Sequence, residues 1–75
     1  MTKTQAFKHS GLTVIAGDDR DYMWRVEYNG KQFTIGEVDG RVDWTPRYHV
    51  TDLQTGEKLC TRANYRTAMH LIKSH

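Results

Sequence analysis

The dipeptide Asn29-Gly30 constrains the fold of this 75-residue chain more than any other feature. It lies between two runs in which apolar and polar residues alternate, in the sequence YMWRVEYNGKQFTIG. An Asn-Gly pair between such runs favours the two-residue turn of a β-hairpin, because both residues accept a positive φ. This turn places Val26 opposite Phe33 and Trp24 opposite Ile35. All four side chains then lie on one face, which we expect to form the core.

A second turn of the same kind is predicted at Asp39-Gly40. The register of that turn would place Val42 opposite Glu37 and Trp44 opposite Ile35. Trp44 would then add a further aromatic ring to the core face of the sheet.

Three further stretches have the composition of short strands. Residues 12–16 (LTVIA) are apolar and rich in β-branched side chains. Residues 47–53 and 57–61 flank the turn sequence QTG and predict another hairpin. In that turn the Asp52 carboxylate can accept hydrogen bonds from the backbone, and Gly56 can supply a positive φ.

The C-terminal part of the chain predicts an amphipathic helix. Asn64 is the favoured N-cap, with Thr61 as the alternative, because either side chain can accept hydrogen bonds from the free N–H groups of the first turn. Apolar residues follow with helical spacing at Tyr65, Ala68, Met69 and Ile72. The predicted fold class is therefore α+β, with a curled antiparallel sheet of four to five short strands covered by one C-terminal helix.

The chain is long enough for one small domain with a single core. We assign residues 11–75 to that domain and expect residues 1–10 to be a flexible N-terminal segment, because they are polar apart from Ala6 and Phe7. Cys60 is the sole cysteine, so no intramolecular disulfide can form and a reduced, cytoplasmic setting is expected. No stretch approaches the ~20 apolar residues of a membrane span, so no membrane partner is expected.

Basic side chains recur along the C-terminal segment at Arg62, Arg66, His70 and Lys73. Steps of four, four and three residues place them on one face of a helix. Residues 47–75 hold five Lys and Arg against two Asp and Glu, whereas residues 1–46 hold six against seven. The carbonyl end of a helix favours cations by ~0.3–1 kcal/mol, which accounts for His70 and Lys73. Arg62 and Arg66 lie at the opposite end of the predicted helix and remain as candidates for a function.

No pattern in the sequence indicates a metal site, a cofactor or a catalytic centre. Spacings of the CxxC or HxxxH kind are absent, and the acidic run DDRD (18–21) does not continue into a calcium-binding loop. We therefore predict no metal ligands, no cofactor and no catalytic residues. The alternative is an enzyme that uses Cys60 as its nucleophile and His49 as the base, although no third orienting residue is indicated.

Residues 24–36 (WRVEYNGKQFTIG), together with the C-terminal helix that contains Ala68, resemble the N-terminal modules of phage tyrosine integrases. The resemblance implies a three-stranded sheet with a C-terminal helix, in which the sheet grips arm-site DNA. The chain departs from this pattern by inserting residues 37–60 before the helix. It also has Glu27 and Glu37 where a DNA-facing sheet would carry bases. In length, lone cysteine and polar termini the chain is similar in style to accessory proteins of phages and other mobile elements.

Two functions of different classes fit these features. The leading hypothesis is a non-enzymatic binding module, a phage-type accessory protein that binds an acidic surface of a host protein and blocks or modulates it, as anti-CRISPR-like inhibitors do. Its expected exposed anchors, of residue types common in interfaces, are Trp44, Tyr48, Arg62 and Arg66. The alternative is a DNA-binding accessory protein, for which a net charge of +2 is small. Its expected contacts are Arg62, Arg66, His70 and Lys73. A homodimer formed through an edge strand is a further expectation.

Overall fold

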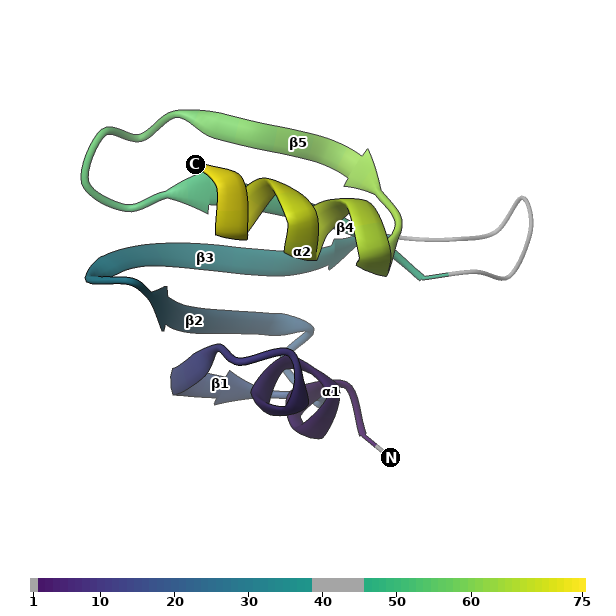
Figure 1. Ribbon diagram of the computed structural model, residues 1–75. Coiled ribbons are helices and arrows are strands. Elements are labelled where there is room, and N and C mark those ends of the chain that lie inside the picture. The colour runs from purple at the N-terminus through teal and green to yellow at the C-terminus, as the bar shows by residue number, and fades with distance from the viewer. Residues whose placement is uncertain (1, 39–45) are drawn as a thin grey trace.

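The structure, a computed structural model, describes residues 2–38 and 46–75 as one sheet and two helices (Figure 1). In chain order the elements are α1 (Lys3–His9), β1 (Thr13–Asp18), β2 (Met23–Tyr28), β3 (Lys31–Val38), β4 (Arg47–Asp52), β5 (Lys58–Ala63) and α2 (Tyr65–Ser74). The five strands form an antiparallel sheet in the order β1-β2-β3-β4-β5, so that β1 and β5 are its edges. The predicted α+β fold, with a sheet of four to five strands, is confirmed.

The hairpin at Asn29-Gly30 has the predicted register. Its two turn residues have positive φ values of 53° and 79°. Val26 lies opposite Phe33 and Trp24 lies opposite Ile35, and all four side chains are buried. Alternation along two strands and the chemistry of one turn are therefore enough to define the centre of the core.

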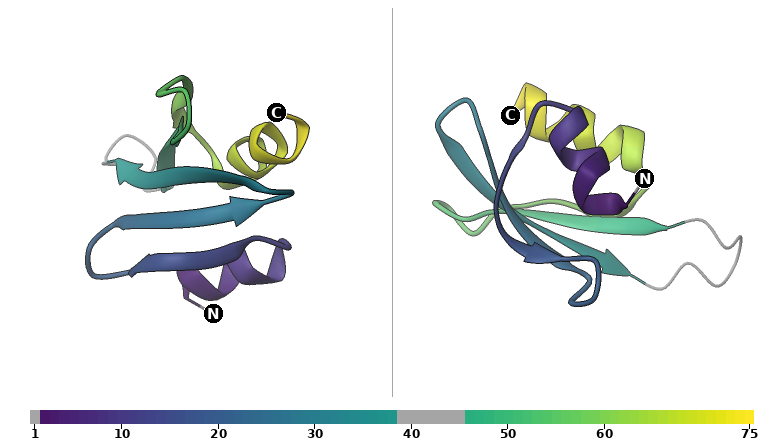
Figure 2. Two further views of the ribbon diagram at one scale, coloured as in Figure 1. Left: turned by 90° about the vertical axis from the view of Figure 1, so that its left-hand side faces the viewer. Right: turned by 90° about the horizontal axis from the view of Figure 1, so that it is seen from below.

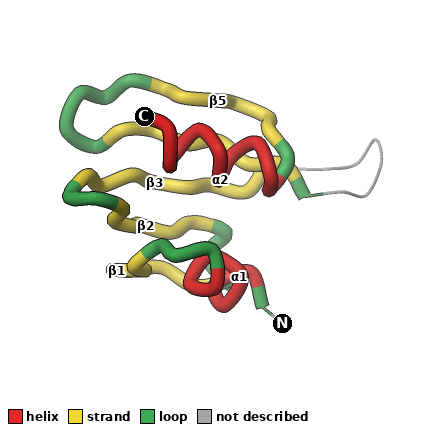
Figure 3. The backbone as a smooth tube through the Cα atoms, in the orientation of Figure 1, coloured by secondary structure: helices red, strands yellow, loops and turns green. Residues whose placement is uncertain are grey.

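The predicted hairpin between β4 and β5 also forms, with a short connecting loop (Figure 3). Asp52 Oδ1 accepts hydrogen bonds from the backbone N–H groups of Gln54 and Thr55, at 2.8 and 3.4 Å. Gly56 has a φ of 76°, as its position in the turn requires. The local chemistry of this turn is confirmed.

The neighbours predicted for Ile35 and Glu37 are wrong, because β4 lies beside β3. Ile35 pairs with Val50, and Glu37 pairs with Tyr48. These partners belong to the strand that follows residues 39–45. The predicted turn and strand residues that lie outside the described part of the chain are Asp39, Gly40, Val42 and Trp44.

Both helices lie on the same face of the sheet, where inward-pointing side chains form the core (Figure 2). The core residues, each at most 5% exposed, are Phe7, Leu12, Trp24, Val26, Phe33, Ile35, Tyr48, Val50, Ala68, Met69 and Ile72. The apolar stripe predicted on the C-terminal helix is part of this core, and Tyr65 packs at its margin. Neither of the two described helices covers the opposite face, which we call the helix-free face.

The N-terminal segment, expected to be flexible, instead contributes α1 to the core. Phe7 is fully buried and packs edge-on against Trp24, with ring centroids 4.9 Å apart. Its ring also stacks on Tyr65 at 6.0 Å, and the Tyr65 hydroxyl donates a 2.8 Å hydrogen bond to the Ala6 carbonyl. Burying a phenylalanine side chain stabilises a fold by about 1.5–3 kcal/mol. Among the described residues, two helices rather than one therefore cover the sheet.

Two short signals in the sequence specify α1. Thr2 and Gln5 form a capping box, in which each side chain accepts a hydrogen bond from the other residue's backbone N–H, at 3.1 and 3.0 Å. Gly11, with a φ of 96°, ends the helix in a Schellman motif, and the Leu12 N–H donates to the Phe7 carbonyl at 3.2 Å. Phe7 and Leu12 then lie together in the core.

The turn between β1 and β2 fixes the start of α1 to the sheet. Asp19 accepts hydrogen bonds from the N–H groups of Lys3 and Thr4 and from the Thr4 hydroxyl, at 2.9, 3.1 and 2.6 Å. The Thr4 hydroxyl is the main cause of the lowered pKa of Asp19, with the two backbone donors adding to it against the effect of burial. The same hydroxyl accepts a 2.8 Å hydrogen bond from the Trp24 indole. One acid of the DDRD run is thus a structural cap.

Candidate interaction surface on helix α2

Helix α2 begins after Asn64, as predicted in preference to Thr61. The Asn64 side chain accepts a 2.8 Å hydrogen bond from the Thr67 N–H. One side of the helix is buried on the sheet, so the residues of the other side face solvent. The exposed basic residues of this other side are Arg66, His70 and Lys73. We call these three residues the α2 basic surface, and it is the candidate interaction surface.

Arg62 does not belong to the helix, although its spacing predicted that it would. It lies in β5, two residues before the N-cap Asn64, where the backbone is extended. Arg62 is exposed and adds a cation close to the start of α2. Of the four basic residues predicted to share one face of the helix, Arg66, His70 and Lys73 therefore lie within it.

The α2 basic surface has no acidic counterpart within the part of the chain that the structure describes. The sequence of α2, YRTAMHLIKS, contains no acid, and the ion pairs found there involve none of the three basic residues. Arg66 lies in the first turn, where the positive end of the helix dipole disfavours a cation, whereas Lys73 lies in the favourable last turn. Arg66 thus has an electrostatic cost that an acidic partner would offset.

His75 holds the C-terminal end of α2 on the sheet. Its Nε2 lies 2.9 Å from Asp52 Oδ2, and its ring packs edge-on against Phe33 at 5.9 Å. The Lys31 ammonium donates a 2.9 Å hydrogen bond to the His75 carbonyl. Asp52 is buried, and the Gln54 N–H is the main cause of its lowered pKa, with His75 adding to the effect against burial. These contacts fix the orientation of α2 and hence of its basic surface.

The exposed position predicted for Tyr48 is wrong, because its side chain belongs to the core. Every second residue of β4 is buried, and Tyr48 is one of them, with 3% of its surface exposed. Its ring packs edge-on against Phe7 and Tyr65, with centroids 5.8 and 6.5 Å away. Burial, helped by the Glu37 carboxylate, raises the pKa of Tyr48 to about 12. Of the other predicted anchors, Trp44 lies outside the described residues.

Cys60 and His49 lie on opposite faces of the sheet, so they do not form the nucleophile and base of the enzyme alternative. Cys60 packs against the core, and its thiol donates a 3.6 Å hydrogen bond to the Tyr48 carbonyl. Burial raises the pKa of the thiol, which disfavours the reactive thiolate. The His49 ring lies over Gly36 on the helix-free face, where a side chain at residue 36 would collide with it.

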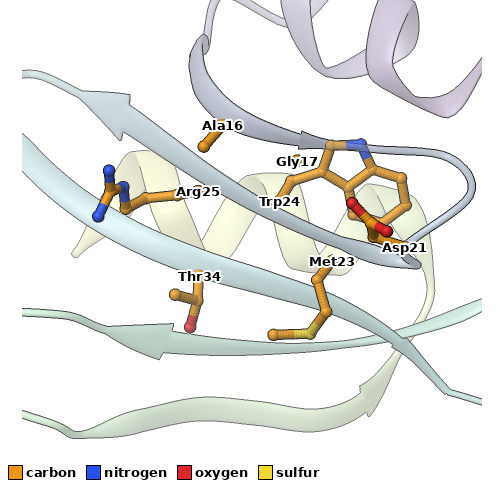
Figure 4. A pocket seen from close by; sticks show the side chains of 7 residues that line it. All are labelled: Ala16, Gly17, Asp21, Met23, Trp24, Arg25 and Thr34. Atoms are coloured by element: carbon orange, nitrogen blue, oxygen red, sulfur yellow. The ribbon is translucent and has the colours of Figure 1, made fainter.

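A shallow hollow of about 340 Å³ lies on the helix-free face, beside a bulge in β1 (Figure 4). Its lining residues are Ala16, Gly17, Asp21, Met23, Trp24, Arg25 and Thr34. Among the described residues, no group of His, Cys, Asp and Glu side chains is arranged to hold a metal ion. The hollow therefore offers apolar contact and two opposite charges rather than a reactive centre.

Exposed apolar side chains near β1 are a feature that sequence reasoning missed. Ile15 is 41% exposed and Met23 is 44% exposed. Ile15 lies within the β1 bulge, where the register shifts between Val14 and Ala16. Such a bulge interrupts the two-residue period of a strand, and the apolar stretch LTVIA does not predict where it occurs.

Of the two acids that stand where a DNA-facing sheet would carry bases, Glu37 lies on the face that the helices cover. Glu37 points toward α1, where the Lys3 ammonium lies 2.5 Å from its Oε1, whereas Glu27 lies on the helix-free face. The resemblance to integrase modules otherwise stays an expectation.

No helix in the described ranges, 2–38 and 46–75, is long and apolar enough to cross a lipid bilayer. A comparison of the chain with known protein families, with curated proteins and with solved structures finds no match in any of the three.

Proposed function

We propose that this chain is a small non-enzymatic binding module, an accessory protein of a phage or another mobile element. It binds an acidic surface of a host protein and blocks or modulates that protein. The observation that carries the proposal is the α2 basic surface, whose three exposed basic side chains pair with no carboxylate of the described residues. The single cysteine of the chain accords with action in the host cytoplasm.

The geometry of α2 defines the kind of acidic surface that fits. Arg66 and Lys73 are seven positions apart, so they span roughly 10 Å along the helix at about 1.5 Å per residue. His70 lies between them on the same side. A row of carboxylates on one face of a partner helix can meet all three. Isolated surface ion pairs contribute only about 0–1 kcal/mol, but complementary charges also speed association and exclude wrong partners.

Arg66 is the side chain expected to contribute most. Its planar guanidinium can hold a carboxylate by two parallel hydrogen bonds, which the Lys73 ammonium cannot do. A carboxylate at this place would also relieve the repulsion between Arg66 and the start of the helix. Arg62 adds a second guanidinium nearby, from the end of β5.

The test compares charge reversals on two exposed positions of the full chain. Arg66→Glu changes the α2 basic surface, and Lys58→Glu makes the matching change on β5. A poly-glutamate peptide serves as the acidic probe, with binding followed by the backbone amide signals of α2. We expect Arg66→Glu to abolish the shifts and Lys58→Glu to retain them. Equal binding by both variants would show that α2 is not the acidic-partner surface.

Nucleic acid is the second candidate partner, because the α2 basic surface and Arg62 together present cations without an acid on the helix. Binding to phosphates would make the logarithm of affinity fall with the logarithm of salt concentration, by roughly 0.9 per contact. Fluorescence anisotropy with a labelled duplex and a labelled single strand measures this slope. A slope of roughly 3 would favour nucleic acid. A flat profile would exclude it.

A further inference from the structure

The tip of the β2–β3 hairpin places an unrestrained side-chain amide beside an accessible backbone nitrogen. Asn29 and Gly30 are both exposed, with φ values of 53° and 79°. The Asn29 side chain has no hydrogen bond to any residue that the structure describes. A Cβ built on Gly30 would meet nothing within 4 Å, so solvent reaches the Gly30 nitrogen. Glycine also hinders an attack by its own nitrogen less than any other residue, because it has no side chain.

The second asparagine of the chain, Asn64, is in the opposite situation. Its side-chain oxygen is held by a 2.8 Å hydrogen bond from the Thr67 N–H. The residue that follows it is Tyr65, whose bulky side chain packs at the margin of the core. The two asparagines therefore have the same amide but different surroundings, and Asn64 serves as a control within the same molecule.

We infer that Asn29 is a site of covalent modification, at which the folded protein loses the side-chain amide. The Gly30 nitrogen gives up its proton to hydroxide and attacks Cγ of Asn29. A new C–N bond closes a succinimide ring, and the side-chain nitrogen takes a proton from water and leaves as ammonia. Water then opens the ring. Opening at Cγ gives aspartate, whereas opening at the main-chain carbonyl carbon gives isoaspartate, whose backbone runs through Cβ and Cγ. The net reaction exchanges an amide for a carboxylate without oxidation or reduction.

The turn itself controls the rate of this reaction. A residue in the left-handed region has a ψ of about +47°. Ring closure requires the Gly30 nitrogen to rotate toward the Asn29 side chain, so this ψ has to change. The pair Tyr28–Lys31 closes the turn and must open first. Hairpin ends open locally at a lower free energy than the core does. Local opening of this turn, and not unfolding of the whole domain, therefore sets the rate in the folded chain.

Isoaspartate at position 29 disturbs the end of α2, because it lengthens the main chain of the turn by one carbon atom. A two-residue turn matches the twist of the flanking strands only with two ordinary residues of positive φ. Lys31 follows the turn directly, and its ammonium donates a 2.9 Å hydrogen bond to the His75 carbonyl. A longer turn displaces Lys31 and breaks this contact. The isoaspartate form therefore has a looser C-terminal end of α2.

Aspartate at the same position has a much smaller effect. Asp-Gly is favoured in this kind of turn, as Asn-Gly is, and it leaves the main chain unchanged. The two products of one ring thus differ in their effect on α2, although both carry the same added charge. This inference does not depend on the function proposed for α2, because it concerns the position of the helix and not what the helix binds.

Mass spectrometry tests the modification after the full chain has been kept in mildly alkaline buffer, with and without strong urea. Trypsin releases residues 26–31 and residues 63–66, with one asparagine in each peptide. We expect peptide 26–31 to gain the mass difference between an acid and an amide, about tenfold or more slowly in the folded chain than in urea. Peptide 63–66 of the folded chain should keep its mass. Asn29→Gly keeps a favoured turn without a side-chain amide, so its peptide 26–31 should also keep its mass. An unmodified Asn29 in the folded chain, or equal rates with and without urea, would overturn the inference.

The isoaspartate form, separated by chromatography, tests the effect on α2. The backbone amide signals of Ser74 and His75 should shift in this form and should stay close to those of the wild type in Asn29→Asp. Equal spectra of the isoaspartate form and of Asn29→Asp would overturn the link between the turn and the helix. Asn29→Gly should bind poly-glutamate like the wild type, so a failed partner-binding test and a failed modification test are distinguishable.

Discussion

The imidazole of His75 lies 2.9 Å from the buried carboxylate of Asp52, and this contact joins the end of α2 to the turn between β4 and β5. Asp52 also caps that turn through the Gln54 and Thr55 N–H groups. One carboxylate therefore holds a hairpin and orients the helix that carries the α2 basic surface.

Asp52→Asn should make the stability of the fold less sensitive to acid. The folded-state pKa of Asp52 is lowered below its ordinary value of 3.8, chiefly by the Gln54 N–H. Its ionised form therefore stabilises the fold above pH 3.8, and this contribution is lost as the pH falls through the lowered pKa. Urea unfolding at a series of pH values from neutral to strongly acidic measures the slope. Glu57→Gln, on an exposed carboxylate 3.9 Å from His75, is the control and should leave the slope nearly unchanged.

Tyr48→Phe should reduce the loss of stability at high pH. The pKa of Tyr48 is raised from 10.0 to about 12, so its neutral form stabilises the fold fully below pH 10, and the contribution disappears as the pH rises toward 12. At about pH 11 the phenylalanine variant should retain about 1 kcal/mol that the wild type has lost. The midpoint of urea unfolding, followed from pH 8 to 11, detects the difference. Tyr22→Phe, on a ring that is 55% exposed, should show no such difference.

Phe7→Ala should destabilise the domain by about 3–5 kcal/mol, because it removes a fully buried ring between the two helices and the sheet. In a domain of this size such a loss leaves little native protein. Near-ultraviolet circular dichroism and urea unfolding measure the effect. Lys8→Ala changes the next, exposed residue and should have little influence. A native-like Phe7→Ala variant would mean that α1 does not belong to the core.

Gly36→Ala should cost about 1–3 kcal/mol, because a Cβ at this position would collide with the His49 ring on the neighbouring strand. His49→Ala in the same chain should recover most of that loss by removing the ring. A double-mutant cycle of unfolding free energies gives the coupling between the two positions. If His49→Ala brings no recovery, the cost of Gly36→Ala comes from the strand itself and not from this contact.

Much of the fold could be predicted because its signals are local. The Asn29-Gly30 turn sets the register of β2 and β3, so Val26 and Phe33 meet as the alternation requires. Asn64 caps α2 and Asp52 caps its turn through hydrogen bonds to residues two or three positions away. The exposed position of Arg66 follows from the period of the helix in the same way.

Other features depend on contacts between residues far apart in the chain. A capping box and a terminal glycine indicate that α1 is a helix, but its place in the core depends on Phe7 meeting Trp24 and Tyr65. Arg62 has helical spacing, yet β5 continues through it because pairing with β4 decides its backbone conformation.

The sequence by itself determined which segments form strands, turns and the C-terminal helix, since neighbouring residues supply the hydrogen bonds and the φ values that these elements need. Only the tertiary structure decided which faces of these strands and of the helix are buried and which are exposed to solvent. Tyr48 is buried because β4 inserts beside β3 and turns it toward α1 and α2, and β1 is an open edge because no other described strand lies on its far side. Burial depends on how the helices pack on the sheet, so the sequence of a single strand does not show which other elements will cover it.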